Sequence, residues 1–110
     1  MSLAERVVHY FEQHLHEPVT LDEVASAMGI SIPLLIRQFR RETGETPIKR
    51  LQRLRVQQAV ALLRGTREPL KVVASRVGIS SLAHLTLLLK RHAGRTPGEF
   101  RRGQDVHHRR

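Results

Sequence analysis

The sequence predicts an all-α fold of about seven helices, in which two helix-turn-helix units are joined by a long central helix. Apolar residues recur at the three- and four-residue spacing of helices, and no segment alternates like a strand or carries a hairpin signal. Val24–Ser31 returns as Val73–Ser80, identical at six of eight positions and displaced by 49. Gly44–Pro47 returns as Gly94–Pro97, displaced by 50, so the second copy holds one added residue. An internal repeat of this kind indicates two copies of one structural unit.

The first two helices have clear boundaries in the sequence. Apolar residues at helical spacing predict a first helix over residues 4–16, which ends before Pro18. Thr20 begins the second helix, because Thr20 and Glu23 have the spacing of a capping box, whose two side chains satisfy backbone donors at a helix start. Gly29 ends it by supplying a left-handed residue.

The third helix completes the first unit. Ser31 caps it, and Leu35 and Phe39 lie on its buried face. Each copy of the repeat thus reads as a helix, a tight turn with glycine and a serine-capped helix, which is the pattern of a helix-turn-helix. Ala25 and Ala74 are small, so the two helices of each unit can cross closely.

The central helix is the longest predicted element. The third helix ends near Gly44, and Thr46 then caps a helix with Pro47 at its first position, where a missing N–H is harmless. Unbroken apolar periodicity continues to about Leu63, before Gly65. Further helices are expected at about 70–77, 81–92 and 97–102. The expected division is a first unit over 1–46, a linker helix over 47–64, a second unit over 65–102 and a basic tail over 103–110.

The charge predicts a polyanionic partner. The chain of 110 residues has a net charge of +9, and 16 of its 19 basic residues are Arg, whose planar fork matches phosphate geometry. Residues 1–36 carry a net charge of −4 and residues 37–110 a net charge of +13. We therefore expect the later part of the chain to meet the polyanion.

Other classes of function find little support. The sequence has no Gly-rich phosphate loop, nucleophile elbow or paired carboxylates on one helical face, so we do not expect an enzyme. There is no cysteine, and the histidines lack the spacing of a zinc helix, so no metal or cofactor is expected. No apolar run approaches the roughly 18 residues of a membrane span, and we expect a soluble, cytoplasmic protein without a membrane partner.

Motifs spread over most of the chain carry a family resemblance. The matching stretches are Val19–Ala25, Met28–Ser31, Phe39–Gly44, Thr46–Pro47, Arg53–Arg55, Ala61–Leu63, Val73–Ala74, Val77–Ser81, His84–Leu85, Lys90–His92 and Thr96–Arg102. From Tyr10 to Arg102 the chain resembles the DNA-binding domain of AraC/XylS-type bacterial transcription regulators. The resemblance implies seven helices and two recognition helices that enter successive major grooves on one face of double-stranded DNA. It therefore implies sequence-specific DNA binding in transcription regulation.

Helical geometry indicates which side chains face the DNA. The stripe opposite Leu35 and Phe39 ends in Arg40, and the corresponding stripe of the second unit ends in Lys90; both suit phosphate contacts. Arg37 is the outward side chain built for a bidentate contact with guanine. Ser31 and Ser80 are expected to act mainly as helix caps, and any contact with a phosphate or base would be additional to that role. The expected DNA-binding residues are Ser31, Pro33, Ile36, Arg37, Arg40 and Arg41 in the first unit, and Ser80, Ser81, Leu82, Ala83, Thr86, Leu87, Lys90 and Arg91 in the second.

The second unit departs from the family pattern. Leu82, Ala83 and Leu87 cannot hydrogen-bond to bases but can pack on thymine methyl groups. Pro69 stands where the family often has a cap residue, and Ala93 where it usually has an aromatic one, so we expect this half to be less stable.

Two questions stay open at this stage. The alternative function is a protein-interaction module that contacts RNA polymerase or another regulator through these apolar stripes. We expect the domain alone to be monomeric. It is either a short stand-alone regulator or the C-terminal fragment of a longer protein, and the Met-Ser-Leu start slightly favours a fragment.

Overall fold

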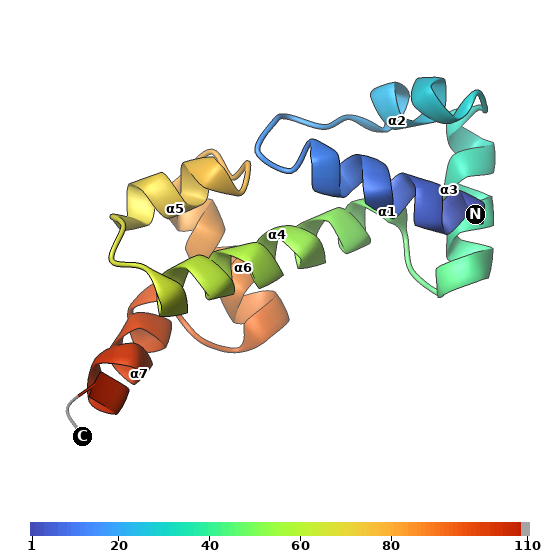
Figure 1. Ribbon diagram of the computed structural model, residues 1–110. Coiled ribbons are helices and arrows are strands. Elements are labelled where there is room, and N and C mark those ends of the chain that lie inside the picture. The colour runs from blue at the N-terminus through green and yellow to red at the C-terminus, as the bar shows by residue number, and fades with distance from the viewer. Residues whose placement is uncertain (109–110) are drawn as a thin grey trace. The chain divides into compact units, whose positions relative to one another are not determined.

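The computed structural model describes the backbone of residues 1–108 and the side chains of residues 1–102. Residues 1–108 form seven helices and no strand, which confirms the predicted all-α class (Figure 1). The helices are α1 Leu3–Gln13, α2 Leu21–Met28, α3 Ile32–Thr43, α4 Pro47–Gly65, α5 Leu70–Arg76, α6 Leu82–Ala93 and α7 Pro97–His108. They belong to two compact units, Met1–Leu54 and Arg55–Arg110.

The first unit packs α1, α2, α3 and the start of α4 around one core. Phe11 and Phe39, from α1 and α3, are completely buried, together with Val7, Val24 and Leu35. Removing each such side chain from water stabilises the fold by about 1.5–3 kcal/mol. This burial holds α3 by its Leu35 and Phe39 side and leaves the opposite side of the helix in solvent.

A polar contact also joins α3 to α1. The Glu42 carboxylate accepts a hydrogen bond from the backbone N–H of Ala4 at 2.9 Å and another from the Gln38 side chain at 2.8 Å. These bonds, that from Gln38 first, lower the pKa of Glu42 below its ordinary value. The negative charge therefore sits at the positive end of the α1 dipole.

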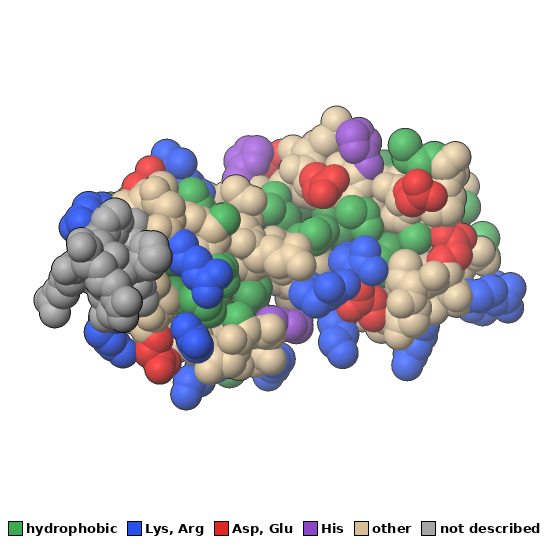
Figure 2. Space-filling model, turned by 60° about the horizontal axis from the view of Figure 1, so that its bottom comes forward, with side chains coloured by type: hydrophobic (Ala, Val, Ile, Leu, Met, Phe, Trp, Pro, Cys, Tyr) green, Lys and Arg blue, Asp and Glu red, His purple; other side chains and the backbone are tan. Residues whose placement is uncertain are grey.

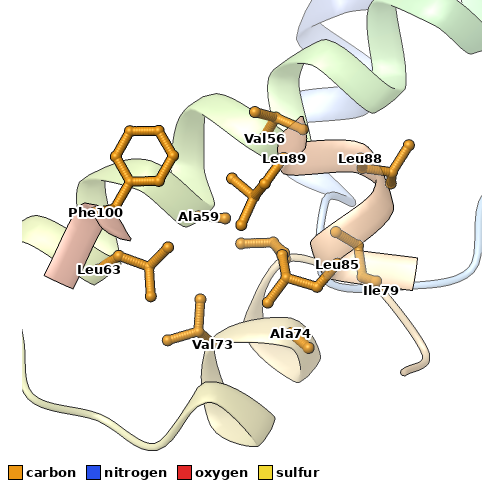
Figure 3. Close-up of a cluster of buried hydrophobic side chains, with 11 residues drawn as sticks. Val56, Ala59, Leu63, Val73, Ala74, Ile79, Leu85, Leu88, Leu89 and Phe100 are labelled. Carbon is orange, nitrogen blue, oxygen red and sulfur yellow. The ribbon is translucent and has the colours of Figure 1, made fainter. Parts of the chain in front are cut away.

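The second unit has a core that is almost wholly aliphatic. Figure 3 shows side chains from α4, α5, α6 and α7 converging, with Leu63, Val73 and Leu85 among them. Phe100 is its one buried aromatic side chain within residues 55–102. Leu89 occupies the repeat position of Phe39, so this core is filled by smaller side chains than the first.

The central helix α4 is confirmed as a single element. It runs without interruption from Pro47 to Gly65, and Thr46 Oγ1 caps its start by accepting the N–H of Lys49 at 3.2 Å. At the other end, the N–H of Thr66 donates to the carbonyl of Leu62 at 3.0 Å. No helix among the described residues is both long enough and apolar enough to cross a membrane.

Two predicted helix ends were wrong. Helix α1 ends at Gln13 and not at residue 16, because Pro18 disfavours helical backbone before it and Glu17 N–H closes a turn onto the carbonyl of His14 at 3.0 Å. Helix α7 continues to His108, where the sequence predicted an end at residue 102. The side chains of the expected basic tail, residues 103–110, lie outside the described part of the chain.

The predicted capping box at Thr20 is only half formed. Thr20 Oγ1 accepts the N–H of Glu23 at 3.2 Å, but α2 shows no return bond from the Glu23 side chain. Complete capping boxes occur at two starts for which none was predicted, Ser2 with Glu5 in α1 and Thr96 with Glu99 in α7. The spacing of the residues permits the box, and the Glu rotamer decides whether it closes.

Candidate nucleic-acid interface

Each unit contains a helix-turn-helix whose turn requires a left-handed residue. Gly29 has φ +72° after α2, and the N–H of Ile30 donates to the carbonyl of Ala25 at 3.1 Å. Gly78 has φ +74° after α5, and the N–H of Ile79 donates to the carbonyl of Ala74 at 2.9 Å. Both alanines are 3% exposed, as close crossing of the paired helices requires. The two turns are therefore copies of one structure, and they deliver α3 and α6 as the second helix of each unit.

The cap of α6 is Ser81, so the prediction that Ser80 would cap it was wrong. Ser81 Oγ accepts the N–H of His84 at 3.1 Å, as Ser31 Oγ accepts the N–H of Leu34 at 3.3 Å in α3. The repeat is displaced by 49 through Ile79 and by 50 from the cap onward. Ser80 is thus the added residue, and it lies exposed in the turn.

The exposed face of α3 carries three arginines. Leu35 and Phe39 are completely buried, so Arg37, Arg40 and Arg41 project into solvent. Within residues 1–102 these three guanidinium groups appear in no hydrogen bond, ion pair or cation-π contact. Pro33 is exposed on the same face, whereas Ile36 is half-buried at its edge. The structure therefore brings the predicted residues of the first unit together on one helix.

The exposed face of α6 has a different chemistry. Lys90 and Arg91 are exposed in its last turn, at the repeat positions of Arg40 and Arg41. Leu87 is 51% exposed at the repeat position of Arg37, and Leu82 is 45% exposed at the start of the helix. The remaining predicted residues also lie on α6, with Ala83 exposed and Thr86 half-buried. The second face is apolar at its centre and cationic at one end.

Lys71 is a candidate that the sequence analysis missed. It lies on α5 and lines a hollow of about 240 Å³. The other lining residues are Ala74, Ser75, Ile79, Ser80, Ser81 and Leu82. The first helix of a helix-turn-helix crosses the DNA backbone, so a cation there suits a phosphate. Lys71 lies in the first turn of α5, the first helix of the second helix-turn-helix, and this position in the sequence could have identified it.

Several other basic side chains are held by carboxylates. Glu45 accepts hydrogen bonds from Arg50 Nε and, at 2.6 Å, from Arg53 Nη2, and Arg76 lies 2.9 Å from Glu68. Burial alone would raise the pKa of Glu45, but the hydrogen bonds from Arg53 and Arg50 outweigh it and the pKa lies below its usual value. Basic side chains gather on both units in Figure 2, but these ion pairs neutralise part of that charge. The arginines of α3 are therefore available to bind an anion, whereas Arg50, Arg53 and Arg76 are already paired with carboxylates. The net charge does not show this difference.

Comparison with known proteins gives the family. A model described as a helix-turn-helix domain matches residues 24–103, which include both turns and both exposed helices. The transcriptional activator RhaS of Enterobacter sp. (strain 638) is 35% identical over 101 residues, which cover 92% of this chain and 36% of RhaS. An AraC-type DNA-binding regulator from Chromobacterium violaceum is 28% identical with a TM-score of 0.86, over 93% of this chain and 91% of that one. The chain belongs to the AraC-type helix-turn-helix family.

Membership of the AraC-type family makes the chain a sequence-specific DNA-binding domain of transcription regulation. The DNA-binding domain of AdpA, whose structure was solved in complex with a target DNA, is 29% identical. It superposes with a TM-score of 0.89 over 97% of this chain and 96% of that domain. The chain spans about a third of the length of the RhaS proteins that it matches.

Proposed function

We propose that α3 and α6 are the recognition helices of this AraC-type domain and enter two successive major grooves of double-stranded DNA. The observation that carries the proposal is the face of α3, where three guanidinium groups that have no partner among residues 1–102 project together. Each unit presents its second helix after an equivalent turn, as the major-groove mode of this motif requires. The AdpA domain, similar over almost the whole chain, was solved on DNA.

The arginines of α3 have two proposed roles. Arg37 lies opposite the buried side of α3, where a side chain reaches furthest into a groove, and its fork matches the N7 and O6 acceptors of guanine. Arg40 and Arg41 lie in the last turn of the helix and suit phosphates. On α6, Lys90 and Arg91 take the phosphate-binding positions, and Lys71 adds a further cation from α5. In this scheme Arg37 reads sequence and the other cations position the domain.

The experiment that tests this scheme starts from duplexes selected out of a random pool by the chain itself. We expect Arg37→Ala to cost about 1–3 kcal/mol on the selected site and to relax the preference at one base pair. Arg40→Ala and Lys90→Ala should weaken binding to all duplexes alike and lower the salt dependence by about one phosphate contact each.

Arg6→Ala is the matched control, because Arg6 is an exposed arginine on α1 and is not part of a proposed recognition helix. It should leave base preference unchanged. If Arg37→Ala and Arg40→Ala caused the same uniform loss, the division between reading and positioning would be wrong.

A protein contact is the second candidate function, and a groove in the first unit favours it. The groove has a volume of about 640 Å³, and its lining includes apolar Ala4 and Val8 and three carboxylates against one cation. The carboxylates are those of Glu5, Glu12 and Glu42, and the cation is Arg50, which is paired with Glu45. Acidic side chains repel DNA, so this surface suits a protein such as RNA polymerase or another regulator. Val8→Asp should then weaken binding to purified RNA polymerase and leave DNA affinity unchanged.

The proposed role places the protein in the bacterial cytoplasm, with the domain acting as a monomer. The repeat supplies two recognition helices in one chain, so a single copy suffices for two half-sites. Sedimentation of the free chain and of its DNA complex would establish the stoichiometry. A complex with two chains on one selected site would contradict the monomer.

A further inference from the structure

The leucines of α6 divide into a buried and an exposed set. Leu85, Leu88 and Leu89 are at most 1% exposed and hold the helix in the core of the second unit. Leu82 and Leu87 are 45% and 51% exposed. Single exposed leucines are common on protein surfaces, but these two lie on the helix that the repeat equates with α3. The recognition face of α6 is thus apolar where that of α3 is cationic.

The equivalence between α3 and α6 assigns each exposed position a counterpart. Counting 50 residues onward, Leu87 takes the place of Arg37 and Ala83 that of Pro33. Lys90 keeps the positive charge of Arg40. The charge that positions the helix on phosphates is therefore retained, while the group that would read the base has changed from a donor to a methyl.

The positive charge around the exposed face of α6 favours a polyanion as its binding partner. Helix α6 contains no Asp or Glu, and its last turn carries the exposed cations Lys90 and Arg91. Lys71 stands beside Leu82 in the hollow at the start of the helix. A second copy of the chain would bring like charges together, whereas phosphates would flank the apolar centre on DNA.

The apolar centre also selects among bases. A leucine pressed against guanine would leave the N7 and O6 acceptors without a donor, which carries the cost of desolvating unsatisfied polar groups. Thymine is the base that offers an apolar group in the major groove, its 5-methyl. Resting on the proposed function, we propose that α6 reads thymine through contacts of Leu87 and Ala83 with the thymine 5-methyl group, with Leu82 at the edge of this surface.

The half-site under α6 must first be identified. The chain contains no cysteine, so single-cysteine variants carry a DNA-cleaving iron chelate at one position only. Leu34→Cys on α3 and His84→Cys on α6 are matched positions, both exposed and 50 residues apart. Cleavage of a duplex selected by the chain then shows which half lies under each helix.

Replacement of thymine by uracil removes the 5-methyl and leaves the hydrogen-bonding edges intact. Each uracil that removes a buried methyl group from the α6 half should weaken binding about fourfold. Leu87→Ala should bind the thymine site less tightly and lose most of the sensitivity to uracil. Val72→Ala, which trims another exposed aliphatic side chain of the same unit, should keep it. Leu87→Arg should shift the preference under α6 toward guanine.

The outcomes separate this proposal from the proposed function. If the chain bound no selected duplex, the DNA-binding role itself would fail. If it bound a selected site with no effect of uracil in the α6 half, the methyl contact would be overturned and the DNA-binding role would stand. If Leu87→Ala retained the full sensitivity to uracil and instead lost binding to RNA polymerase, the face would be a protein contact and the proposal would fail.

Discussion

Replacement of Ser81 and of Ser80 by alanine should have clearly different effects. Ser81 has extended backbone, φ −149° and ψ 156°, and its hydroxyl accepts the N–H of His84 at 3.1 Å, one of the donors that a helix start leaves unpaired. Loss of such a cap costs about 0.5–2 kcal/mol, typically about 1. Ser80 is exposed in the turn and caps nothing, so Ser80→Ala should change the free energy of unfolding by less than about 0.5 kcal/mol.

Urea unfolding followed by circular dichroism would measure both variants, with Ser31→Ala as the matched loss of a cap in the first unit. A loss of about 1 kcal/mol corresponds to roughly 4–8 °C in melting temperature for a small domain. Ser81→Ala should also speed amide exchange in the first turn of α6. Equal losses for Ser80→Ala and Ser81→Ala, or a larger loss for Ser80→Ala, would refute the placement of the added residue at position 80.

Three further predictions concern stability. The pKa of Glu42 is lowered in the folded state, so the ionised carboxylate stabilises the fold above about pH 4.5, and this stabilisation is lost as the pH falls through the folded pKa. Glu42→Gln should therefore flatten the acid side of a plot of unfolding free energy against pH, measured by urea unfolding. Gly29→Ala should cost about 1–2 kcal/mol in thermal unfolding and Gly29→Asn less, because φ is +72° and no atom crowds the position. Leu85→Ala should lower the free energy of unfolding by about 2–5 kcal/mol because Leu85 is buried, and Leu87→Ala should lower it by less than about 0.5 kcal/mol because Leu87 is exposed. Similar losses for the two variants would contradict the assignment of the faces of α6.

The sequence predicted the elements well where a local signal was strong. The span of α4 follows from Thr46 and Pro47 at its start and an apolar period that continues without a break to its end. The glycine turns follow equally well, because a left-handed residue ends a helix wherever it stands. Ends without such a signal were harder to place, as at α1, where Leu15 keeps the apolar period although the helix ends at Gln13.

The sequence predicted which residues form the candidate site, but it did not predict which basic side chains are free to bind DNA and which are paired with carboxylates. The spacing of Leu35 and Phe39 placed Arg37 and Arg40 on the outward face of α3, and their exposure agrees. The positive charge of the later part of the chain gave no indication that Arg50 and Arg53 are tied to Glu45. The repeat matched Ser80 with Ser31 by their neighbours, and only the hydrogen bond of Ser81 corrected that match.

The sequence by itself determined the class of fold, the two helix-turn-helix units and the faces of α3 and α6. These depend on interactions within one helix or one turn, where spacing along the chain is also spacing in space. The tertiary structure decided which arginines are free, which serine caps α6, and that Glu42 closes the start of α1 from a distance of 38 residues. These depend on which side chains of separate segments meet in three dimensions, and a linear pattern does not contain that information.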